Sequence, residues 1–194
     1  PYKRRRRLHR VVAEYLELSF DEETAAAASA SLLSLHYAEA GVHPKAWAYG
    51  VLAGDLARMQ WASQNAAAAY TRALQSASRI RDIDREVVVR VAEALSDCLL
   101  VTGDFAGANA AIDKARKNNH DLATEVDLMR KRGVIAERQG ETTQAIRWFS
   151  RARKLLPGGT FQKDLLRSSA QLNLAHAGVH PVSYTHLTLP TTVF

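Results

Sequence analysis

Apolar side chains recur along most of this chain three to four positions apart, the spacing that places them on one face of an α-helix. Glycine, proline and polar residues interrupt the pattern and indicate turns between successive helices. No segment shows the sustained alternation of apolar and polar residues that indicates a strand. The sequence therefore predicts an all-α fold. Helices are expected at residues 3–18, between Asp21 and Gly41, from Pro44 toward Trp61, and at 63–78, 84–102, 105–118, 121–139, 142–156 and 161–177.

A second pattern, of glycine, alanine and bulky apolar residues, repeats inside this series. Gly103 and Gly140 are each followed at +5 by alanine, at +9 by a bulky apolar residue and at +12 by alanine again. Glycine ends a helix in the left-handed conformation without strain, and the alanines let two helices approach closely while the bulky residue fills the gap. A third copy has Trp61 where the glycine would stand. This recurrence predicts stacked helix pairs. The residues that would hold them are Gly103, Ala108, Ile112 and Ala115; Gly140, Ala145, Phe149 and Ala152; and Ala66, Tyr70 and Ala73.

The composition is that of an ordinary globular protein. The 194 residues are 47% apolar and 24% charged. No run of about 18 uninterrupted apolar residues is present, so we expect no membrane-spanning helix and no membrane partner. Cys98 is the single cysteine, which excludes an intramolecular disulfide and fits a reducing, cytoplasmic location.

The net charge of +6 is concentrated at the beginning of the chain. Six of the first ten residues are lysine or arginine and none is acidic, whereas the remainder has equal numbers of basic and acidic residues. The cluster from Lys3 to Arg10 can be a solvated helix face, a contact surface for another domain, or a salt-sensitive contact with nucleic-acid phosphates. Leu8, Val11 and Val12 continue in helical register, which favours the solvated face.

Residue types that carry chemistry do not assemble into a site. His36 and His43 stand on either side of the Gly41 turn, and no H-E-x-x-H or Cys/His spacing provides a metal site. Cys98 lies in an apolar helix, where a buried structural thiol is expected, because no motif places a histidine to activate it. We therefore expect no catalytic residue, no cofactor and no metal in this segment. The tryptophans are expected to pack between helices rather than to stack on a ligand: Trp47, Trp61 and Trp148.

The end of the chain differs in composition from the rest. Residues 181–194 contain no charged residue and no alanine. The run at residues 182–191, VSYTHLTLPT, resembles the translation of a transposon-based sequencing adaptor. We therefore expect three regions: a helix at residues 1–20 that closes an upstream domain, helical repeats at 21–178, and a non-native tail at 179–194.

The turn glycines, the alanines and Phe149, with Pro157 closing the second helix, resemble tetratricopeptide repeats over about residues 47–178. The alanines equivalent to Ala108 lie 42 residues before it and 37 after it, against about 34 in that family, so these would be diverged repeats. The resemblance implies a right-handed α-solenoid of antiparallel helix pairs, whose first helices line a concave face. In the family register that face would carry the candidate partner-binding residues Arg90, Glu93, Asp97, Asp127, Arg130, Val134, Glu137 and Arg138.

A further likeness covers the first part of the chain. The segments RRRRLHRVVAEYLE, LLSLHYAEAG and AWAYGVLAGDLARMQWASQNAAAAYTRAL are similar to a stretch of the STAND-type predicted ATPases of bacteria. These proteins are often fused to adenylate cyclase domains or to LuxR-type DNA-binding domains, and in them an Arg-Leu-His helix closes the nucleotide-binding region. No G-x-x-x-x-G-K-[ST] phosphate loop occurs in this chain, so the resemblance implies that the ATPase lies upstream.

Three functions follow as expectations. The leading one is a protein–protein interaction and regulatory repeat module of a bacterial signal-transduction ATPase or transcriptional regulator. It would bind a protein, a peptide or another domain of the same chain, with no catalysis in this segment. One alternative is a fragment of a larger enzyme, a class III adenylate cyclase or an NTPase, whose catalytic domain lies upstream. The other is nucleic-acid contact through the N-terminal arginine cluster, with an affinity that falls steeply with salt.

Overall fold

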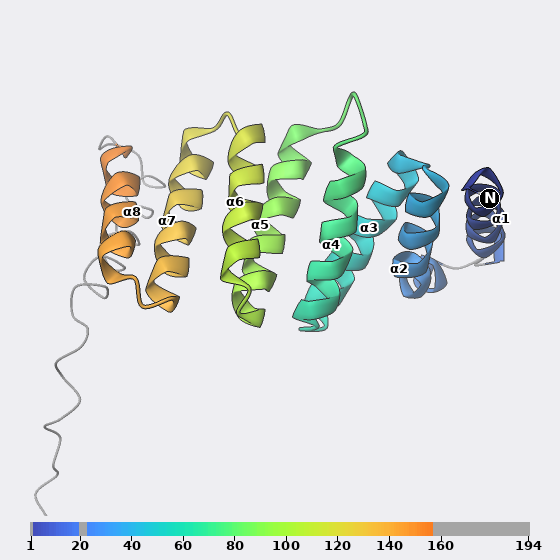
Figure 1. Cartoon of the computed structure of the whole chain (residues 1–194), viewed down its shortest axis with the longest axis horizontal. Coiled ribbons are helices and arrows are strands. Elements are labelled where there is room, and N and C mark those ends of the chain that lie inside the picture. The colour runs from blue at the N-terminus through green and yellow to red at the C-terminus, as the bar shows by residue number, and fades with distance from the viewer. Residues whose placement is uncertain (1, 20–22, 157–194) are drawn as a thin grey trace, which may run out of the picture. The chain divides into compact units, whose positions relative to one another are not determined.

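A computed structural model of the chain describes residues 2–19 and 23–156, and of residues 23–28 the backbone alone. These residues form helices and no strand, which confirms the all-α prediction for this part of the chain (Figure 1). The predicted helix at 161–177, the Asp21 cap, the tail and both expected region boundaries lie outside the described residues. The helices are α1 Tyr2–Ser19, α2 Glu23–Ala40, α3 His43–Met59, α4 Ser63–Ala77, α5 Arg85–Thr102, α6 Phe105–Asn118, α7 Leu122–Arg138 and α8 Thr142–Lys154.

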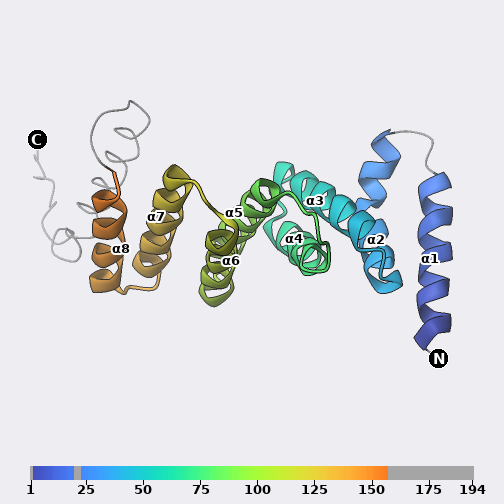
Figure 2. The same ribbon diagram turned by 90° about the horizontal axis from the view of Figure 1, so that it is seen from above.

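The chain divides into two compact units between His120 and Asp121, and each unit is described by itself. In the first unit each helix from α1 to α6 packs against the next, and α2 also contacts α4 (Figure 2). In the second unit α7 packs against α8. Among the described helices, none combines the length and the apolar character that crossing a membrane requires.

Four turns share one backbone conformation. Gly41, Trp61, Gly103 and Gly140 each have a positive φ, of 74°, 60°, 81° and 78°. In every case the N–H of this residue donates to the carbonyl three positions earlier, and the N–H of the next residue donates to the carbonyl five positions earlier. This pairing is the left-handed helix end that satisfies the last carbonyls of a helix. The turn predicted at Gly41 is confirmed, and it has the same conformation as the three turns of the glycine and alanine repeat although the repeat did not include it.

The positions predicted to hold the hairpins together are buried. Gly103 and Gly140 occupy their turns, and the side chains at +5, +9 and +12 are shielded from solvent. The following residues are all 0% exposed: Ala66, Tyr70, Ala73, Ala108, Ile112, Ala115, Ala145, Phe149 and Ala152.

A fourth position, seven residues before each turn residue, completes the fit between paired helices. Gly54 of α3 and Gly133 of α7 stand at this position. A Cβ added at Gly54 would lie 2.3 Å from the ring of Tyr70, and one at Gly133 would lie 2.2 Å from the ring of Phe149. Each aromatic ring is therefore seated directly on a helix backbone, which only glycine allows.

The other two hairpins have different residues at the same two positions. Ser96 of α5 pairs in register with Ile112 of α6, and both are buried. Ser34 of α2 lies against Gly50 of α3, where an added Cβ would be 2.9 Å from the serine oxygen. In each pair the larger of the two residues faces a smaller one on the partner helix, Ile112 facing Ser96 and Ser34 facing Gly50, as close packing requires.

Aspartates begin three of the helices. Asp84 accepts hydrogen bonds from the first-turn N–H groups of α5, Asp104 from Gly107 of α6, and Asp121 from Thr124 of α7. Such caps contribute about 1 kcal/mol each. The caps and the left-handed turns together explain why the predicted and observed helix ends agree within about two residues.

Candidate functional site

The residues predicted to line a groove fall into two sets. Arg90, Glu93 and Asp97 lie on α5 in the first unit. The second set lies on α7 in the second unit and comprises Asp127, Arg130, Glu137 and Arg138, with Val134 beside them. Because the two units are described separately, each set is considered within its own unit.

In the first unit, Arg90 takes part in a polar network with helices α3 and α4. Its Nη1 lies 3.1 and 3.3 Å from the two carboxylate oxygens of Asp55, and the Tyr70 hydroxyl donates to the same carboxylate. Burial raises the pKa of the Tyr70 hydroxyl, and the hydrogen bond to Asp55 raises it further. The Arg90 side chain is half exposed, so the ion pair itself contributes at most about 1 kcal/mol. Arg90 of α5 thus connects to α3 and α4 through Asp55. Asp55 was not among the predicted residues.

In the second unit, two of the predicted residues form an ion pair, and a tryptophan outside the predicted set lies between two arginines. Arg130 lies 2.7 Å from Asp127 one turn away on the same helix. Arg132 of α7 and Arg151 of α8 place their guanidinium carbons 4.9 and 5.0 Å from the ring centroid of Trp148. Trp148 therefore packs between side chains of both helices through cation–π contacts. Glu137 is half-buried and Arg138 is exposed.

Trp61 does not pack between helices, and that expectation was wrong. Its side chain is 92% exposed, because the turn position that it occupies directs a side chain into solvent. Together with Val101, which is also exposed, it lines a shallow cavity of about 370 Å³ between the α3–α4 turn and the end of α5. A left-handed conformation is strained for any residue that carries a side chain, so this turn is less favourable than its three glycine counterparts.

The apolar face of α1 also lies in solvent. Its opposite face carries Ala13, which is fully buried against Leu33, Tyr37 and Ala46. We use the name α1 stripe for five large apolar side chains that follow helical spacing on the face away from Ala13 and are between 40% and 82% exposed. They are Leu8, Val11, Val12, Tyr15 and Leu18.

Polar contacts attach α1 to α2. Arg5 forms a 2.9 Å ion pair with Glu39, and Arg6 donates through Nε and Nη2 to the carbonyl of Ala40, the last residue of α2. A cation at a helix C-terminus is favourable because it meets carbonyls that lack helical partners. Part of the basic cluster is therefore used inside the fold. Lys3, Arg4, Arg7 and Arg10 are exposed.

Two histidines meet at the same interface. His9 and His36 place their Nδ1 atoms 2.9 Å apart, so one of these nitrogens carries the donated proton. Burial lowers the pKa of His36, and the neighbouring His9 lowers it further. His36 is therefore packed at the interface between α1 and α2, with His9 as its partner.

Glu17 is the centre of a polar cluster that joins α1 to α2 and α3. Its carboxylate accepts hydrogen bonds from the Tyr37 hydroxyl, from Lys45 Nζ at 2.6 Å and from the Tyr49 hydroxyl at 2.6 Å. Burial alone would raise the pKa of Glu17, but the three hydrogen bonds outweigh burial and lower it to about 2. The carboxylate is therefore ionised at neutral pH and holds α1 in place. Sequence analysis did not identify this cluster, because one glutamate and two tyrosines on three different helices form no recognisable motif.

The described part of the chain can be examined for metal ligands and for a reactive thiol. Within residues 2–19 and 23–156, no three His, Cys, Asp or Glu side chains gather closely enough to hold a metal ion. Cys98 is buried in α5, and burial raises the pKa of its thiol. A thiol in such a site is a poor nucleophile, because the reactive form is the thiolate.

No protein-family model and no curated protein matches this chain. The function is therefore argued from the surfaces just described.

Proposed function

We propose that this chain is a helical-repeat module that binds another protein or domain through the α1 stripe. The observation that carries the proposal is the exposure of five large apolar side chains on one face of a single helix. Contiguous apolar surface of this kind marks interaction sites on soluble proteins. The spacing of Leu8, Val11, Val12 and Tyr15 is that of the anchors by which one helix packs against another.

The opposite face of α1 is held firmly, which supports presentation of the stripe to a partner. Ala13 is fully buried, Arg6 caps α2, and Glu17 accepts three hydrogen bonds from α2 and α3. Because these contacts already order α1, covering its exposed face costs little further conformational entropy, and this favours binding.

The charges around the stripe indicate the chemistry of the partner. Arg4 lies one helical turn before Leu8, and Arg7 lies one turn before Val11. Both arginines are exposed, so the stripe is apolar along its length and positive at its beginning. The matching surface would be a helix with an apolar face and acidic residues at the end that meets these arginines.

The architecture supports a repeat protein. The four turns have identical hydrogen bonding, and each is flanked by paired positions that combine a large residue with a smaller one. We infer that the hairpins belong to a tetratricopeptide-like, right-handed solenoid of antiparallel helix pairs. The resemblance to STAND-type regulators then suggests the partner: a nucleotide-binding domain of the same polypeptide, covering the α1 stripe and regulated through it.

Site-specific photo-cross-linking in the natural full-length gene product would test this proposal. A cross-linking amino acid placed at Tyr15 should give a defined intramolecular or intermolecular adduct. The matched control is the same amino acid at Arg147, an exposed position of α8. Adduct formation at neither position, or equally at both, would show that the α1 stripe is not a docking surface.

A further inference from the structure

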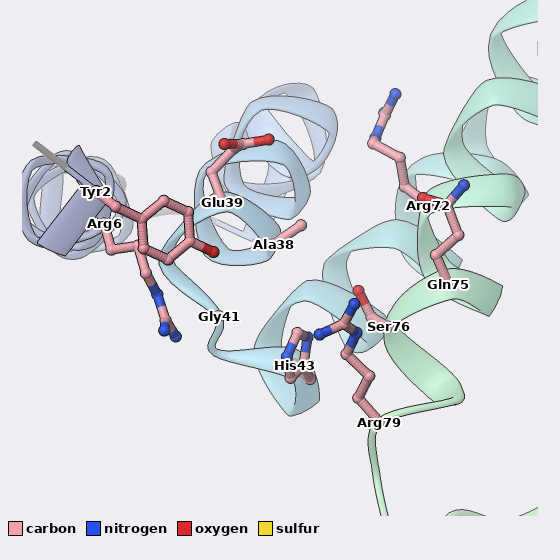
Figure 3. A pocket seen from close by; sticks show the side chains of 10 residues that line it. All are labelled: Tyr2, Arg6, Ala38, Glu39, Gly41, His43, Arg72, Gln75, Ser76 and Arg79. Carbon is pink, nitrogen blue, oxygen red and sulfur yellow. The ribbon is translucent and has the colours of Figure 1, made fainter.

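A basic cavity lies between the first four helices, away from the α1 stripe. Its volume is about 290 Å³. Figure 3 shows Tyr2 and Arg6 of α1 on one side and His43 at the beginning of α3. On the other side lie Arg72 of α4 and Arg79, which follows the end of α4. These residues come from helices that the Glu17 cluster and the close packing of α3 on α4 hold together.

The lining of this cavity is strongly cationic. Among the described residues that line it are three arginines and one histidine, against a single acidic residue, Glu39. Glu39 already forms an ion pair with Arg5, which neutralises its charge. The cationic field acts on His43 as well, since burial first, and then Arg79 and Arg6, lower its pKa. Unbalanced positive charge in a concave site concentrates anions there.

The position of Arg6 depends on a glycine. Its guanidinium lies directly on Gly41, where an added Cβ would be 1.8 Å from Nη2. Two of its nitrogens, Nε and Nη2, are bound to the Ala40 carbonyl, and Nη1 makes no hydrogen bond among the described residues. The charge of Arg6 is therefore fixed in place, and Nη1 keeps its capacity to donate hydrogen bonds.

Two further polar atoms in the lining are buried and have no partner within the described part of the chain. They are Nδ1 of His43 and Nε of Arg72. Arg72 is anchored by its Nη2, which donates to Ser31 Oγ at 2.9 Å. Buried polar atoms in folded proteins almost always have a hydrogen-bond partner. An anion in the cavity would supply that partner to both.

The beginning of α3 adds to the same field. His43 is the first residue of α3, and its side chain lines the cavity. The positive end of the α3 dipole favours negative charge beside the arginines. Helix terminus, guanidinium groups and unpartnered donors therefore point to the same class of ligand.

We propose that this cavity binds the phosphate group of a small organic phosphate. Planar arginine forks match phosphate oxygens in charge and geometry. The volume lies at the lower end of the roughly 300–1,000 Å³ typical of small-molecule pockets. A concave site of this size fits a phosphorylated metabolite of a few carbons better than the extended backbone of a nucleic acid.

Calorimetric titration of the whole chain, with inorganic phosphate, ribose 5-phosphate and AMP as probes, tests this proposal. We expect both phosphomonoesters to bind, and ribose, which lacks the phosphate, to show no binding. Arg79→Gln should weaken phosphate binding at least about tenfold, which corresponds to about 1.4 kcal/mol. Gln75→Glu, which places a carboxylate in the lining, should weaken it further through repulsion.

Both variants should fold normally, because Arg79 and Gln75 are exposed. Circular dichroism and thermal unfolding check this point. The matched control is Arg7→Gln, since Arg7 is an exposed α1 arginine outside the cavity and should leave the affinity unchanged. Absence of binding by all three phosphates would overturn the proposal. So would an equal loss in Arg7→Gln and Arg79→Gln, or tighter binding of single-stranded RNA that both variants weaken alike, because either would indicate a general basic surface.

Discussion

In the α3–α4 hairpin and in the α7–α8 hairpin, a glycine of the first helix lies against an aromatic ring of the second. Gly54 receives Tyr70 in the former, and Gly133 receives Phe149 in the latter. An added Cβ would overlap the ring almost equally in both. The two hairpins differ in the residue that follows the helix glycine, which is Asp55 in α3 and Val134 in α7.

This difference matches the chemistry of the two rings. The Tyr70 hydroxyl donates to Asp55, which also pairs with Arg90, whereas Val134 packs against the cluster that contains Phe149. The buried hydroxyl of Tyr70 needs a hydrogen-bond acceptor, whereas the ring of Phe149, which has no hydroxyl, needs an apolar neighbour. The helix glycine and the ring are thus the shared part of the design, and the neighbouring residue changes with the polarity of the ring.

The turn residue is the second difference. Gly140 has its left-handed φ without steric cost, whereas Trp61 has a similar φ with a side chain attached. A Cβ added at Gly103 or at Gly140 would have no atom within 4 Å, so only backbone strain disfavours a side chain in these two turns. The comparison suggests that the glycine under the ring is required more strictly than the glycine of the turn.

The largest expected effect is the loss of a ring. Phe149→Ala should destabilise the second unit by about 3–5 kcal/mol, because it leaves a cavity over Gly133 that the helix backbone cannot fill. Chemical denaturation measures the change in the free energy of unfolding. The exposed substitution Glu141→Ala is the control and should change it by less than about 0.5 kcal/mol.

A smaller but more specific effect is expected under the ring. Gly133→Ser should destabilise by about 1–3 kcal/mol through overpacking, although serine is the better helix former. Combining it with Phe149→Ile recreates the Ser96 and Ile112 pair of the α5–α6 hairpin and should recover part of the loss. A double-mutant cycle measures this coupling. Strictly additive effects would show that the two positions do not fit each other as described.

The polar neighbour is expected to contribute about as much as one hydrogen bond. Tyr70→Phe should destabilise the first unit by about 0.5–1.5 kcal/mol. The reverse substitution, Phe149→Tyr, should be less well tolerated, because Val134 offers no acceptor to the new hydroxyl. Equal unfolding free energies for the two variants, each relative to the wild type, would contradict the link between Asp55 and the tyrosine.

The smallest effect concerns the turn. Trp61→Gly should stabilise by up to about 1 kcal/mol, since it removes left-handed strain from a residue whose side chain is exposed. Gly140→Ala should destabilise by about 1 kcal/mol for the same reason. Thermal unfolding distinguishes the signs. A destabilised Trp61→Gly variant would show that the indole makes a contact that its exposure does not reveal.

The features that sequence predicted are those encoded locally. Helix ends followed from glycines and aspartates, and the buried alanines followed from their fixed distance to Gly103 and Gly140. The turn at Gly41 was predicted from its glycine, but it was not grouped with the other three turns because Gly50 stands at its +9 position, where the repeat required a bulky residue. The size of that residue depends on its partner Ser34, which the spacing rule did not include.

The candidate sites could not be predicted in the same way, because they depend on which helix covers which face. The spacing of Leu8, Val11 and Tyr15 showed an apolar face but not that it would be left uncovered. The role of Arg90 depends on Asp55, which lies 35 residues away in the sequence. The basic cavity draws on helices from Tyr2 to Arg79, and no local pattern brings these together.

Helix α3 lies between two of the left-handed turns: it follows the turn at Gly41 and precedes the turn at Trp61. It is the second member of one pairing and the first member of another, and its Gly50 lies against both Ser34 of α2 and Ala73 of α4. A larger side chain at Gly50 would therefore disturb two helix pairs at once, whereas a larger side chain at Gly133 would disturb only the packing of α7 against α8.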